Sequence, residues 1–158
     1  MTTVTTTGRV TITITTTDQQ SPERGGTNHA VATWQGDWLC SVQAGDFELI
    51  VDEPVSAGGT GRGPMPTDLL LASLSSCYAL ALVWAARKRG IDLPDLMVTA
   101  TGAYAGQTFR ALTLTVRTSA AADVVTPLLE PARRVCYVSN TLTNIPDISV
   151  RLAAPNAG

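Results

Sequence analysis

The sequence has few of the residues that metal and nucleic-acid sites need. His29 is the only histidine and the three cysteines are far apart in the chain, whereas zinc sites use closely spaced cysteine and histidine residues. There are only 11 basic residues, with no basic run longer than Arg87–Arg89, and the net charge is −2. We therefore predict no metal site and no nucleic-acid partner, and we interpret His29 as an exposed bystander.

The N-terminus, MTTVTTTGRV, lacks the basic and continuous apolar segments of a secretory signal, and we expect a cytoplasmic protein. An odd number of cysteines in such a chain is not typical of a disulfide framework. Reduced thiols with a structural or a reactive role are the expected alternative.

The length of 158 residues and the hydrophobic content of 44% fit one compact domain. Near the N-terminus, Arg9–Thr17 alternates apolar residues with threonine, which predicts a strand or arm, and the polar segment that follows reads as a linker. We therefore assign residues 1–26 to an N-terminal strand, arm and linker, and residues 27–158 to the folded domain.

Several short runs have strand composition. Those at 29–34, 38–43 and 47–52 predict a meander, and the next loop, SAGGTGRGPMP, has too many glycines to be regular structure and no phosphate-binding pattern. Runs at 96–106 and 109–119 predict a hairpin, and residues 147–154 a last strand. With the helices described next, this order predicts an α+β fold with largely antiparallel sheet.

A long helix is predicted between Pro66 and Arg89. Proline at its start, Asp68 in its first turn, basic residues at its end and Gly90 just beyond are typical helix boundaries. Its central 18 residues, Leu69–Ala86, carry no charge. An uncharged segment of this length is at the lower limit for crossing a bilayer. The alternative is a central helix buried on every side, which a dimer could enclose by wrapping two such helices; we prefer this interpretation and predict no membrane association.

A second helical pattern covers residues 121–140, and Pro127 and Pro131 predict that it is kinked or split there. Cys77 and Cys136 thus lie on two different predicted helices among apolar neighbours. Because free cysteine behaves as a small hydrophobic residue, burial in the core is one interpretation of both. A reactive role is the other, although a cysteine–histidine hydrolase has no local support with a single histidine.

Four segments in order resemble one known family: VDEP (51–54), GGTGRGPMPTDLLLASLSSC (58–77), RKRGIDLPDL (87–96) and ARRVCYVSNTL (132–142). Together they resemble the OsmC/Ohr family of thiol peroxidases, in its OsmC-like branch. The resemblance implies an intertwined homodimer in which antiparallel sheets from both chains wrap two long central helices. It also implies two active sites at the subunit interface, and it explains an apolar helix in a water-soluble chain.

The resemblance further implies a two-cysteine mechanism for the reduction of organic hydroperoxides. Cys77 matches the peroxidatic cysteine and becomes a sulfenic acid, and Cys136 matches the resolving cysteine that closes a disulfide. No cofactor is implied; an external dithiol, such as one of the lipoyl type, would restore the thiols. Cys40 matches no position of the family and is interpreted as a strand core residue.

The activating residues of the hydroperoxide-resistance branch are missing from this sequence. Its arginine position falls at Gly36 and its glutamate position at Thr67, while Asp68 matches an acidic position of other OsmC-like branches. Arg62 and Arg133 are candidate replacement cations, because a buried thiol needs a cation or hydrogen-bond donors to ionise.

Two alternative functions follow from these departures. The chain could be a non-catalytic protein that binds an apolar small molecule at the dimer interface. It could also be an interaction or sensing protein that uses the N-terminal arm.

Overall fold

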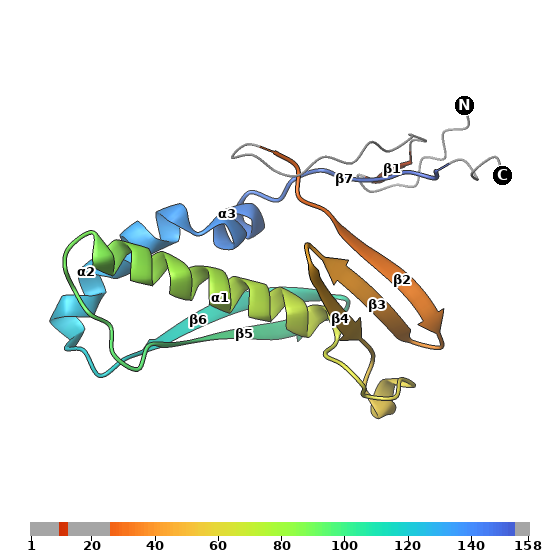
Figure 1. The fold of residues 1–158 in the computed structure, drawn as a ribbon, viewed down its shortest axis with the longest axis horizontal. Helices are drawn as coiled ribbons and strands as arrows, with labels where there is room; N and C mark the ends of the chain where they lie inside the picture. The colour runs from red at the N-terminus through yellow and green to blue at the C-terminus, as the bar shows by residue number, and fades with distance from the viewer. Residues whose placement is uncertain (1–9, 13–25, 154–158) are drawn as a thin grey trace. The chain divides into compact units, whose positions relative to one another are not determined.

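The computed structural model describes residues 10–12 and 26–153 (Figure 1). Contacts between residues divide the chain into two units, one of residues 30–143 and one of residues 1–29 with 144–158. The folded domain predicted over residues 27–158 is therefore broader than the larger unit. Most of the predicted arm, at residues 1–9 and 13–25, lies outside the described residues.

The smaller unit contains two short strands, β1 (Val10–Ile12) and β7 (Ile148–Val150). They pair in parallel, with Val10 opposite Ile148 and Ile12 opposite Val150. Both strands fall inside segments predicted to be extended, and their parallel pairing differs from the antiparallel pairing of the other sheets.

The larger unit begins with the predicted meander, the antiparallel sheet of β2 (Ala30–Gly36), β3 (Leu39–Ala44) and β4 (Phe47–Val51). Its turns use residues that tolerate positive φ, among them Gly45 with φ 59°. Large apolar side chains on this sheet are exposed in the single chain, including Trp34, Trp38 and Phe47. Such a surface is unusual for a protein that acts as a monomer.

Asp52 organises the glycine-rich loop that leads from this sheet to the long helix. Its buried carboxylate accepts hydrogen bonds from the Thr60 hydroxyl (2.6 Å) and from the N–H groups of Thr60 and Arg62 (3.1 Å each). These bonds, the Thr60 hydroxyl first, hold the pKa of Asp52 below its usual value. The loop also contains a 3-10 turn, η1 (Val55–Ala57). At Gly59 a Cβ atom would lie 1.9 Å from the Glu53 carbonyl oxygen, so close backbone packing explains that glycine.

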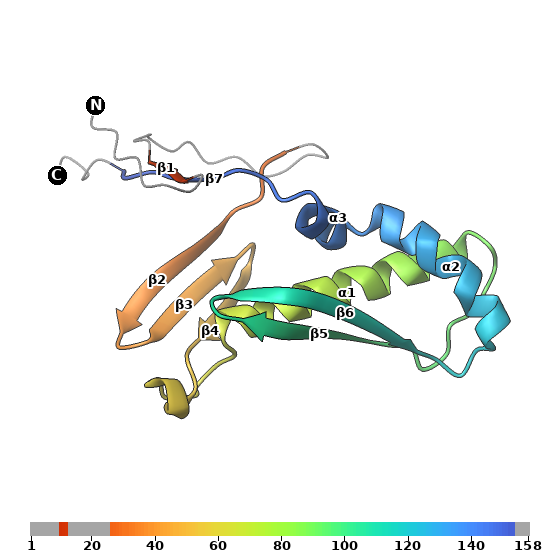
Figure 2. The same cartoon turned by 180° about the vertical axis from the view of Figure 1, so that it is seen from behind.

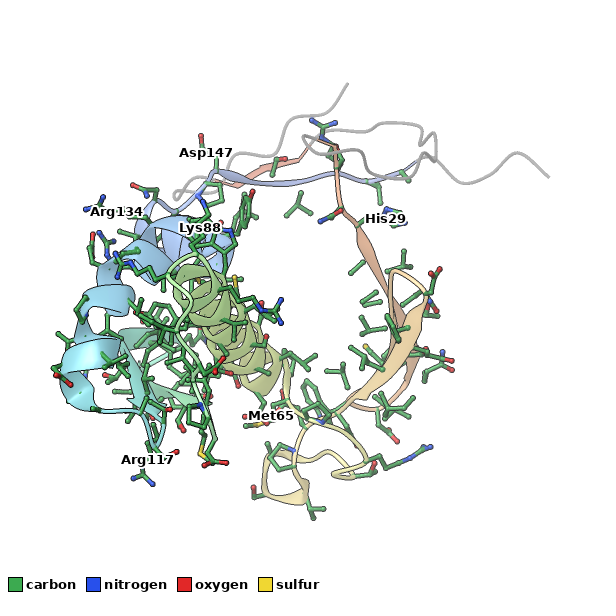
Figure 3. All side chains as sticks on the ribbon, turned by 60° about the vertical axis from the view of Figure 1, so that its left-hand side comes forward. His29, Met65, Lys88, Arg117, Arg134 and Asp147 are labelled. Atoms are coloured by element: carbon green, nitrogen blue, oxygen red, sulfur yellow. The ribbon has the colours of Figure 1, made fainter. Side chains whose placement is uncertain are left out.

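Helix α1 (Pro66–Arg87) confirms the predicted long helix. The Met65 N–H donates to the Asp68 carboxylate at 3.1 Å and thereby caps its start, and Gly90 beyond its end has φ 64°. Met65 and Lys88 mark its two ends in Figure 3. One face of α1 is buried within the single chain. Its buried residues are Leu74, Tyr78, Ala81, Leu82, Ala85 and Ala86.

The opposite part of α1 is not covered within the chain, since Leu80 is 72% exposed and Trp84 42% exposed. By length and composition alone α1 could cross a membrane, with a mean hydropathy of 1.9. It packs, however, against α2, α3 and β5. The core helix of a soluble protein has the same composition, which agrees with our preferred interpretation.

The predicted hairpin is present as β5 (Met97–Ala105) and β6 (Thr108–Arg117), which pair antiparallel and lie along α1 (Figure 2). Apolar residues of both strands, including Val98, Leu114 and Val116, pack against the core around α1. This sheet therefore closes one side of the helix.

Helices α2 (Ala122–Val135) and α3 (Tyr137–Thr143) replace the single predicted pattern at 121–140. The helical pattern was predicted to be kinked or split at Pro127 and Pro131, and a split there is wrong, because both prolines lie inside α2 and the break is at Cys136. Proline at 131 removes the N–H that would bond the carbonyl of residue 127. The Arg89 guanidinium instead donates to the Pro127 carbonyl oxygen at 2.9 Å, so that this carbonyl keeps a donor.

Candidate active site

Cys77 and Cys136 meet in the core of the larger unit. Cys77 lies in the middle of α1, Cys136 lies between α2 and α3, and their sulfurs are 3.3 Å apart in hydrogen-bond contact. Both are free thiols. Cys136 is fully buried and Cys77 is partly buried, so the helices bring two reactive groups together in a place largely closed to water.

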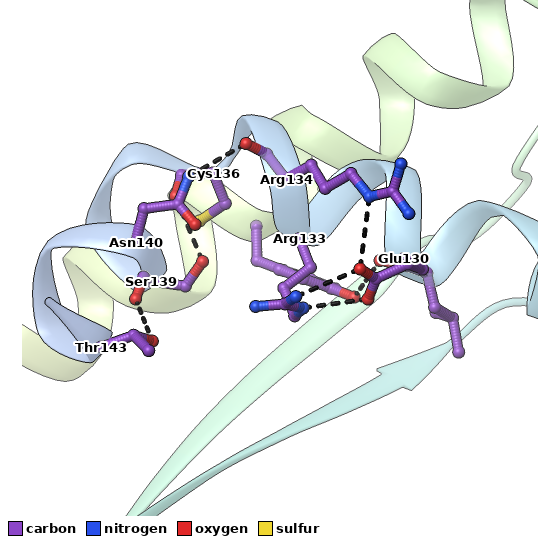
Figure 4. A network of polar contacts seen from close by, with 9 residues as sticks. Glu130, Arg133, Arg134, Cys136, Ser139, Asn140 and Thr143 are labelled. Atoms are coloured by element: carbon purple, nitrogen blue, oxygen red, sulfur yellow. Dashed lines mark hydrogen bonds and ion pairs between the residues drawn. The ribbon is translucent and has the colours of Figure 1, made fainter.

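The backbone at Cys136 explains why its side chain turns toward α1. Its ψ of 103° is extended, so α2 ends there, and its N–H still donates to the Ala132 carbonyl oxygen at 3.0 Å. Its carbonyl oxygen then accepts from the Asn140 N–H at 3.1 Å and from the Ser139 hydroxyl at 3.2 Å (Figure 4). The junction is thus held by hydrogen bonds on both sides.

Tyr78, next to Cys77 in α1, joins the two helices at the site. Its hydroxyl donates to the Leu129 carbonyl oxygen in α2 at 2.9 Å. Burial, together with the nearby Cys136 thiolate, raises the pKa of Tyr78, so the phenol stays protonated. Sequence reasoning did not select this residue.

The two thiols differ in acidity. Burial raises the pKa of Cys77, and the Cys136 sulfur beside it raises it further, although backbone N–H groups of Val138 and Tyr137 act in the opposite direction. Burial also opposes ionisation of Cys136, but the hydroxyl and N–H of Ser139 and the thiol of Cys77 outweigh it and lower the pKa of Cys136. When the pair loses a proton, the negative charge is therefore favoured on Cys136 rather than on Cys77.

Two adjoining cavities lie next to the cysteine pair. Their volumes are about 340 and 360 Å³, and both are lined by Leu114, Ser139 and Thr143. Leu74 lines one of them and Tyr78 the other, so the cavities reach the turns of α1 on either side of Cys77. Their walls combine apolar side chains with a few hydroxyl groups, and each also contains an arginine, Arg110 in one and Arg133 in the other. Such a lining suits a ligand with an apolar body and one polar or negatively charged end.

Two predicted supporting residues lie at the start of α1, far from the sulfur in the same chain. The Thr67 hydroxyl accepts a hydrogen bond from the Tyr104 hydroxyl at 2.9 Å, and Asp68 caps the helix. Nine or ten residues of helix correspond to roughly 14–15 Å at about 1.5 Å per residue. Thr67 and Asp68 therefore stabilise the start of the helix and do not contact Cys77 of their own chain.

The two candidate cations are also occupied elsewhere or exposed. The Arg133 side chain forms an ion pair with Glu130 at 2.9 Å, which raises the pKa of Arg133. Arg62 is exposed in the glycine-rich loop, and its backbone N–H binds Asp52. At the position of the family's arginine, Gly36 ends β2 with φ 106°. The structure thus places neither arginine against the sulfurs.

The other singled-out residues lie outside the cysteine pair. Cys40 is half-buried on β3, where it pairs with Trp34 and Val51, so it is a strand residue as predicted but less enclosed than a core residue. His29 is exposed, as predicted. Ser139 is the residue that sequence reasoning missed most clearly. Its position three residues after Cys136 on a predicted helix was the available signal.

The profile of the OsmC-like protein family matches residues 59–151, which is more than half of the chain and includes both cysteines. The chain belongs to this family. No curated protein gives a significant match. The predicted resemblance to the OsmC/Ohr family is confirmed, and so is the α+β class of an OsmC-like fold.

Solved structures of OsmC-like proteins have the same fold. A putative osmotic stress induced and detoxification response protein from Psychrobacter arcticus is 26% identical, with a TM-score of 0.61 and coverage of 82% of this chain and 97% of that one. A putative organic hydroperoxide resistance protein from Vibrio cholerae, with captopril bound in one of its active sites, is 24% identical, with a TM-score of 0.60 and coverage of 84% and 92%. The organic hydroperoxide resistance protein OhrB of Bacillus subtilis is 20% identical, with a TM-score of 0.59 and coverage of 81% and 98%. Together with the family match, these neighbours show that this chain has the OsmC-like fold.

Proposed function

We propose that this OsmC-like protein is a thiol-dependent peroxidase that reduces organic hydroperoxides through Cys77 and Cys136. The observation that carries the proposal is the 3.3 Å contact between the two sulfurs of residues that lie 59 positions apart. A pair at this distance needs only a small displacement to reach the S–S bond length of about 2.05 Å.

The proposed reaction has two steps. The Cys77 sulfur attacks the outer oxygen of the hydroperoxide, the O–O bond breaks, and the alcohol leaves while Cys77 becomes a sulfenic acid. The Cys136 thiolate then attacks the Cys77 sulfur, the disulfide forms, and hydroxide leaves. An external dithiol, such as one of the lipoyl type, restores both thiols, and no cofactor takes part.

The surroundings of the pair favour an apolar substrate. The adjoining cavities have apolar groups of leucine, valine and phenylalanine in their walls, together with hydroxyl groups and one arginine each, Arg110 or Arg133. Transfer of an alkyl group into such a space is favourable, whereas hydrogen peroxide gains little from it. This supports organic hydroperoxides as the substrate class.

The proposed active form is a cytoplasmic homodimer of the OsmC-like type. The exposed part of α1, with Leu80 and Trp84, supports it, because a second copy of the chain would cover an apolar surface that is otherwise in water. The second copy would then also cover the part of the cysteine pair that is still open to solvent in the single chain.

The first experiment treats the reduced protein with one equivalent of cumene hydroperoxide and maps its cysteine peptides by mass without reduction. We expect a prompt disulfide between Cys77 and Cys136, with Cys40 still free. The Cys40→Ser variant is the matched control and should behave like the wild type. Two unreacted thiols, under conditions that oxidise an active OsmC-like protein, would contradict the peroxidase proposal.

A second candidate is a non-catalytic OsmC-like protein that binds an apolar small molecule at the dimer interface. It is favoured by the raised pKa of Cys77 and by the positions of Arg62 and Arg133, which do not activate it. In that case Cys77→Ala would leave binding of an apolar fluorescent probe unchanged, and hydroperoxide would oxidise the wild type slowly or not at all.

A further inference from the structure

Arg110 is a charged residue on the side of β6 that faces α1 (Figure 2). Every second side chain of a strand points to the same face. Leu114 and Val116 pack against the core around α1, and Arg110 stands at the same alternate positions of β6. It lines the cavity of about 340 Å³ together with Leu74 of α1. An arginine thus occupies a position where the alternation of β6 would favour an apolar residue.

A β-bulge in the hairpin lies at the same place. Phe109 is opposite Tyr104 and the next pair is Ala111 with Ala103, so Arg110 is an extra residue without a cross-strand partner. Phe109 and Arg110 are neighbours in the chain, and yet both line the cavity. The Phe109 ring is fixed there by the Tyr104 ring, at 4.5 Å between centroids. Bulges redirect side chains in this way and are frequent next to functional sites.

The charge of Arg110 is not balanced by a neighbour. It is the single charged residue among the described residues that line this cavity, and within the described part of the chain it forms no ion pair and no side-chain hydrogen bond. Arg133, in the wall of the adjoining cavity, differs. Its Nε and Nη2 groups donate to the two carboxylate oxygens of Glu130 at 2.9 and 3.1 Å. An anionic group that enters the two cavities therefore meets an uncompensated cation only at Arg110.

The hydroxyl groups of the same wall have already used their protons. The Ser139 hydroxyl donates to the Cys136 carbonyl oxygen at 3.2 Å, and the Thr143 hydroxyl donates to the Ser139 carbonyl oxygen at 2.8 Å. Because a hydroxyl has one proton, these oxygens can only accept a further hydrogen bond. Among the side chains that line this cavity, only Arg110 is therefore free to donate to an anion. A carboxylate fits a guanidinium best, since two parallel hydrogen bonds can form.

The cavity extends from Arg110 toward the cysteine pair. It shares Leu114, Ser139 and Thr143 with the adjoining cavity, and Leu114 packs against the core cluster that contains Cys136. Four residues of strand separate Arg110 from Leu114, about 13 Å at roughly 3.3 Å per residue. A ligand that reaches both places must therefore have its charged group and its reacting group at opposite ends of an apolar chain.

We propose that Arg110 is a specificity-determining residue that binds a carboxylate at the far end of the substrate. The protein then prefers hydroperoxides in which an apolar chain separates a carboxylate from the peroxide group over neutral hydroperoxides. The proposal rests on the peroxidase function proposed above and adds a charge preference to it. The carboxylate takes no part in the reaction at the two sulfurs; it fixes the position of the chain.

The first test measures binding and needs no peroxide. Octanoate and 1-octanol have the same chain length and differ in charge, and isothermal titration calorimetry of the reduced full chain at pH 7 gives the Kd of each. Arg110→Leu should weaken octanoate binding about five- to tenfold and leave 1-octanol binding unchanged. Arg110→Lys keeps the charge without the planar fork and should restore part of the loss. A wild type that binds octanoate no more tightly than 1-octanol overturns the proposal.

Arg117→Leu is the matched control for this titration. It removes the same charge from the same strand, but Arg117 lines a cavity of about 500 Å³ that shares no lining residue with the cavity of Arg110. Octanoate binding should not change. Equal weakening by both variants would reveal an effect of net charge alone and overturn the proposal. Unchanged octanoate binding in Arg110→Leu would also overturn it, as expected if a carboxylate of a second copy already occupied Arg110.

The second test compares kcat/KM for 8-hydroperoxyoctanoate and for octyl hydroperoxide, with dihydrolipoamide as the reductant. Arg110→Leu should lower kcat/KM for the acid about five- to tenfold through KM, and leave that for octyl hydroperoxide unchanged. Equal kcat/KM values for the two substrates in the wild type would overturn the role of Arg110 and leave the peroxidase function intact. Reduction of neither would contradict the peroxidase function, and the octanoate titration would still decide whether Arg110 binds a carboxylate.

Discussion

The sulfur of Cys77 lies 3.3 Å from the sulfur of Cys136 and thereby joins the middle of α1 to the junction of α2 and α3. One partner is fully buried and the other partly so, and backbone N–H groups and a hydroxyl from the start of α3 surround them. The contact is therefore part of the packed core, and oxidation of the two thiols would change how the core is held together. A bond between the two sulfurs would add a covalent link between elements that are now held by packing and by hydrogen bonds such as that from Tyr78 to Leu129.

Oxidation should stabilise the protein against unfolding. A disulfide between Cys77 and Cys136 closes a long loop, for which the chain-entropy estimate is about 4 kcal/mol. We expect the midpoint of urea unfolding to rise on oxidation and to return on reduction with dithiothreitol. Cys77→Ser should show no such difference, and equal midpoints for oxidised and reduced wild type would contradict a bond that fits the native structure.

The rate of disulfide formation should depend on pH with a midpoint below that of an ordinary thiol. The pKa of Cys136 is lowered from its ordinary value of 9.0 by Ser139 and Cys77 in spite of burial. The Cys136 thiolate is the nucleophile of disulfide closure, so the rate of this second step, followed separately from the oxidation of Cys77, rises with pH and is lost as the pH falls through this lowered pKa. Stopped-flow measurement with excess cumene hydroperoxide from pH 5 to 10 would check this, and a midpoint at or above 9.0 would contradict it.

Much of the fold could be predicted because its signals are local. The boundaries of α1 follow from Pro66, Asp68 and Gly90, and the β5–β6 hairpin follows from alternation around a short turn. The apolar composition of α1 predicted a helix buried on every side. Within the single chain the structure shows burial of one face only.

The parts that failed depend on distant residues. Pro131 does not break α2, because the Arg89 guanidinium, 38 residues from Pro127, reaches the carbonyl that the proline leaves free. The contact between Cys77 and Cys136 likewise arises from the packing of three helices. Spacing along the chain contains no information on such contacts, so the pairing of the cysteines came from the family resemblance.

The bond from Arg89 to Pro127 gives a prediction on stability. Arg89→Ala should lower the free energy of unfolding by about 1 kcal/mol, the usual contribution of a hydrogen bond to an exposed charged group. Pro131→Ala restores the N–H of residue 131 and with it a helical donor for the same carbonyl. In that background Arg89→Ala should therefore cost clearly less, and a double-mutant cycle by urea unfolding measures the difference. Equal costs in the two backgrounds would contradict the bond.

Asp52 should stabilise the protein only while its carboxylate is charged. Hydrogen bonds from Thr60 and Arg62 lower the pKa of Asp52, so its contribution is present above the unfolded-state pKa and is lost as the pH falls through the lower folded-state value. Asp52→Asn places an amide N–H group against these donors. We expect its Tm to be several degrees lower at pH 7, with the difference from the wild type shrinking below about pH 4. Asp46→Asn, in the exposed turn before β4, is the matched control.

The exposed face of α1 predicts how the protein associates. Leu80 and Trp84 are one helical turn apart and both are largely uncovered in the single chain. If a second copy covers them, Leu80→Glu places a charge in the apolar interface and should shift the protein from dimer to monomer in sedimentation velocity measurements. Thr126→Glu, which places the same charge at an exposed position of α2, is the matched control and should leave the dimer intact. A wild type that sediments as a monomer at micromolar concentration would contradict the homodimer. Because the cysteine pair would then be more open to water, it would also weaken the case for an interface active site.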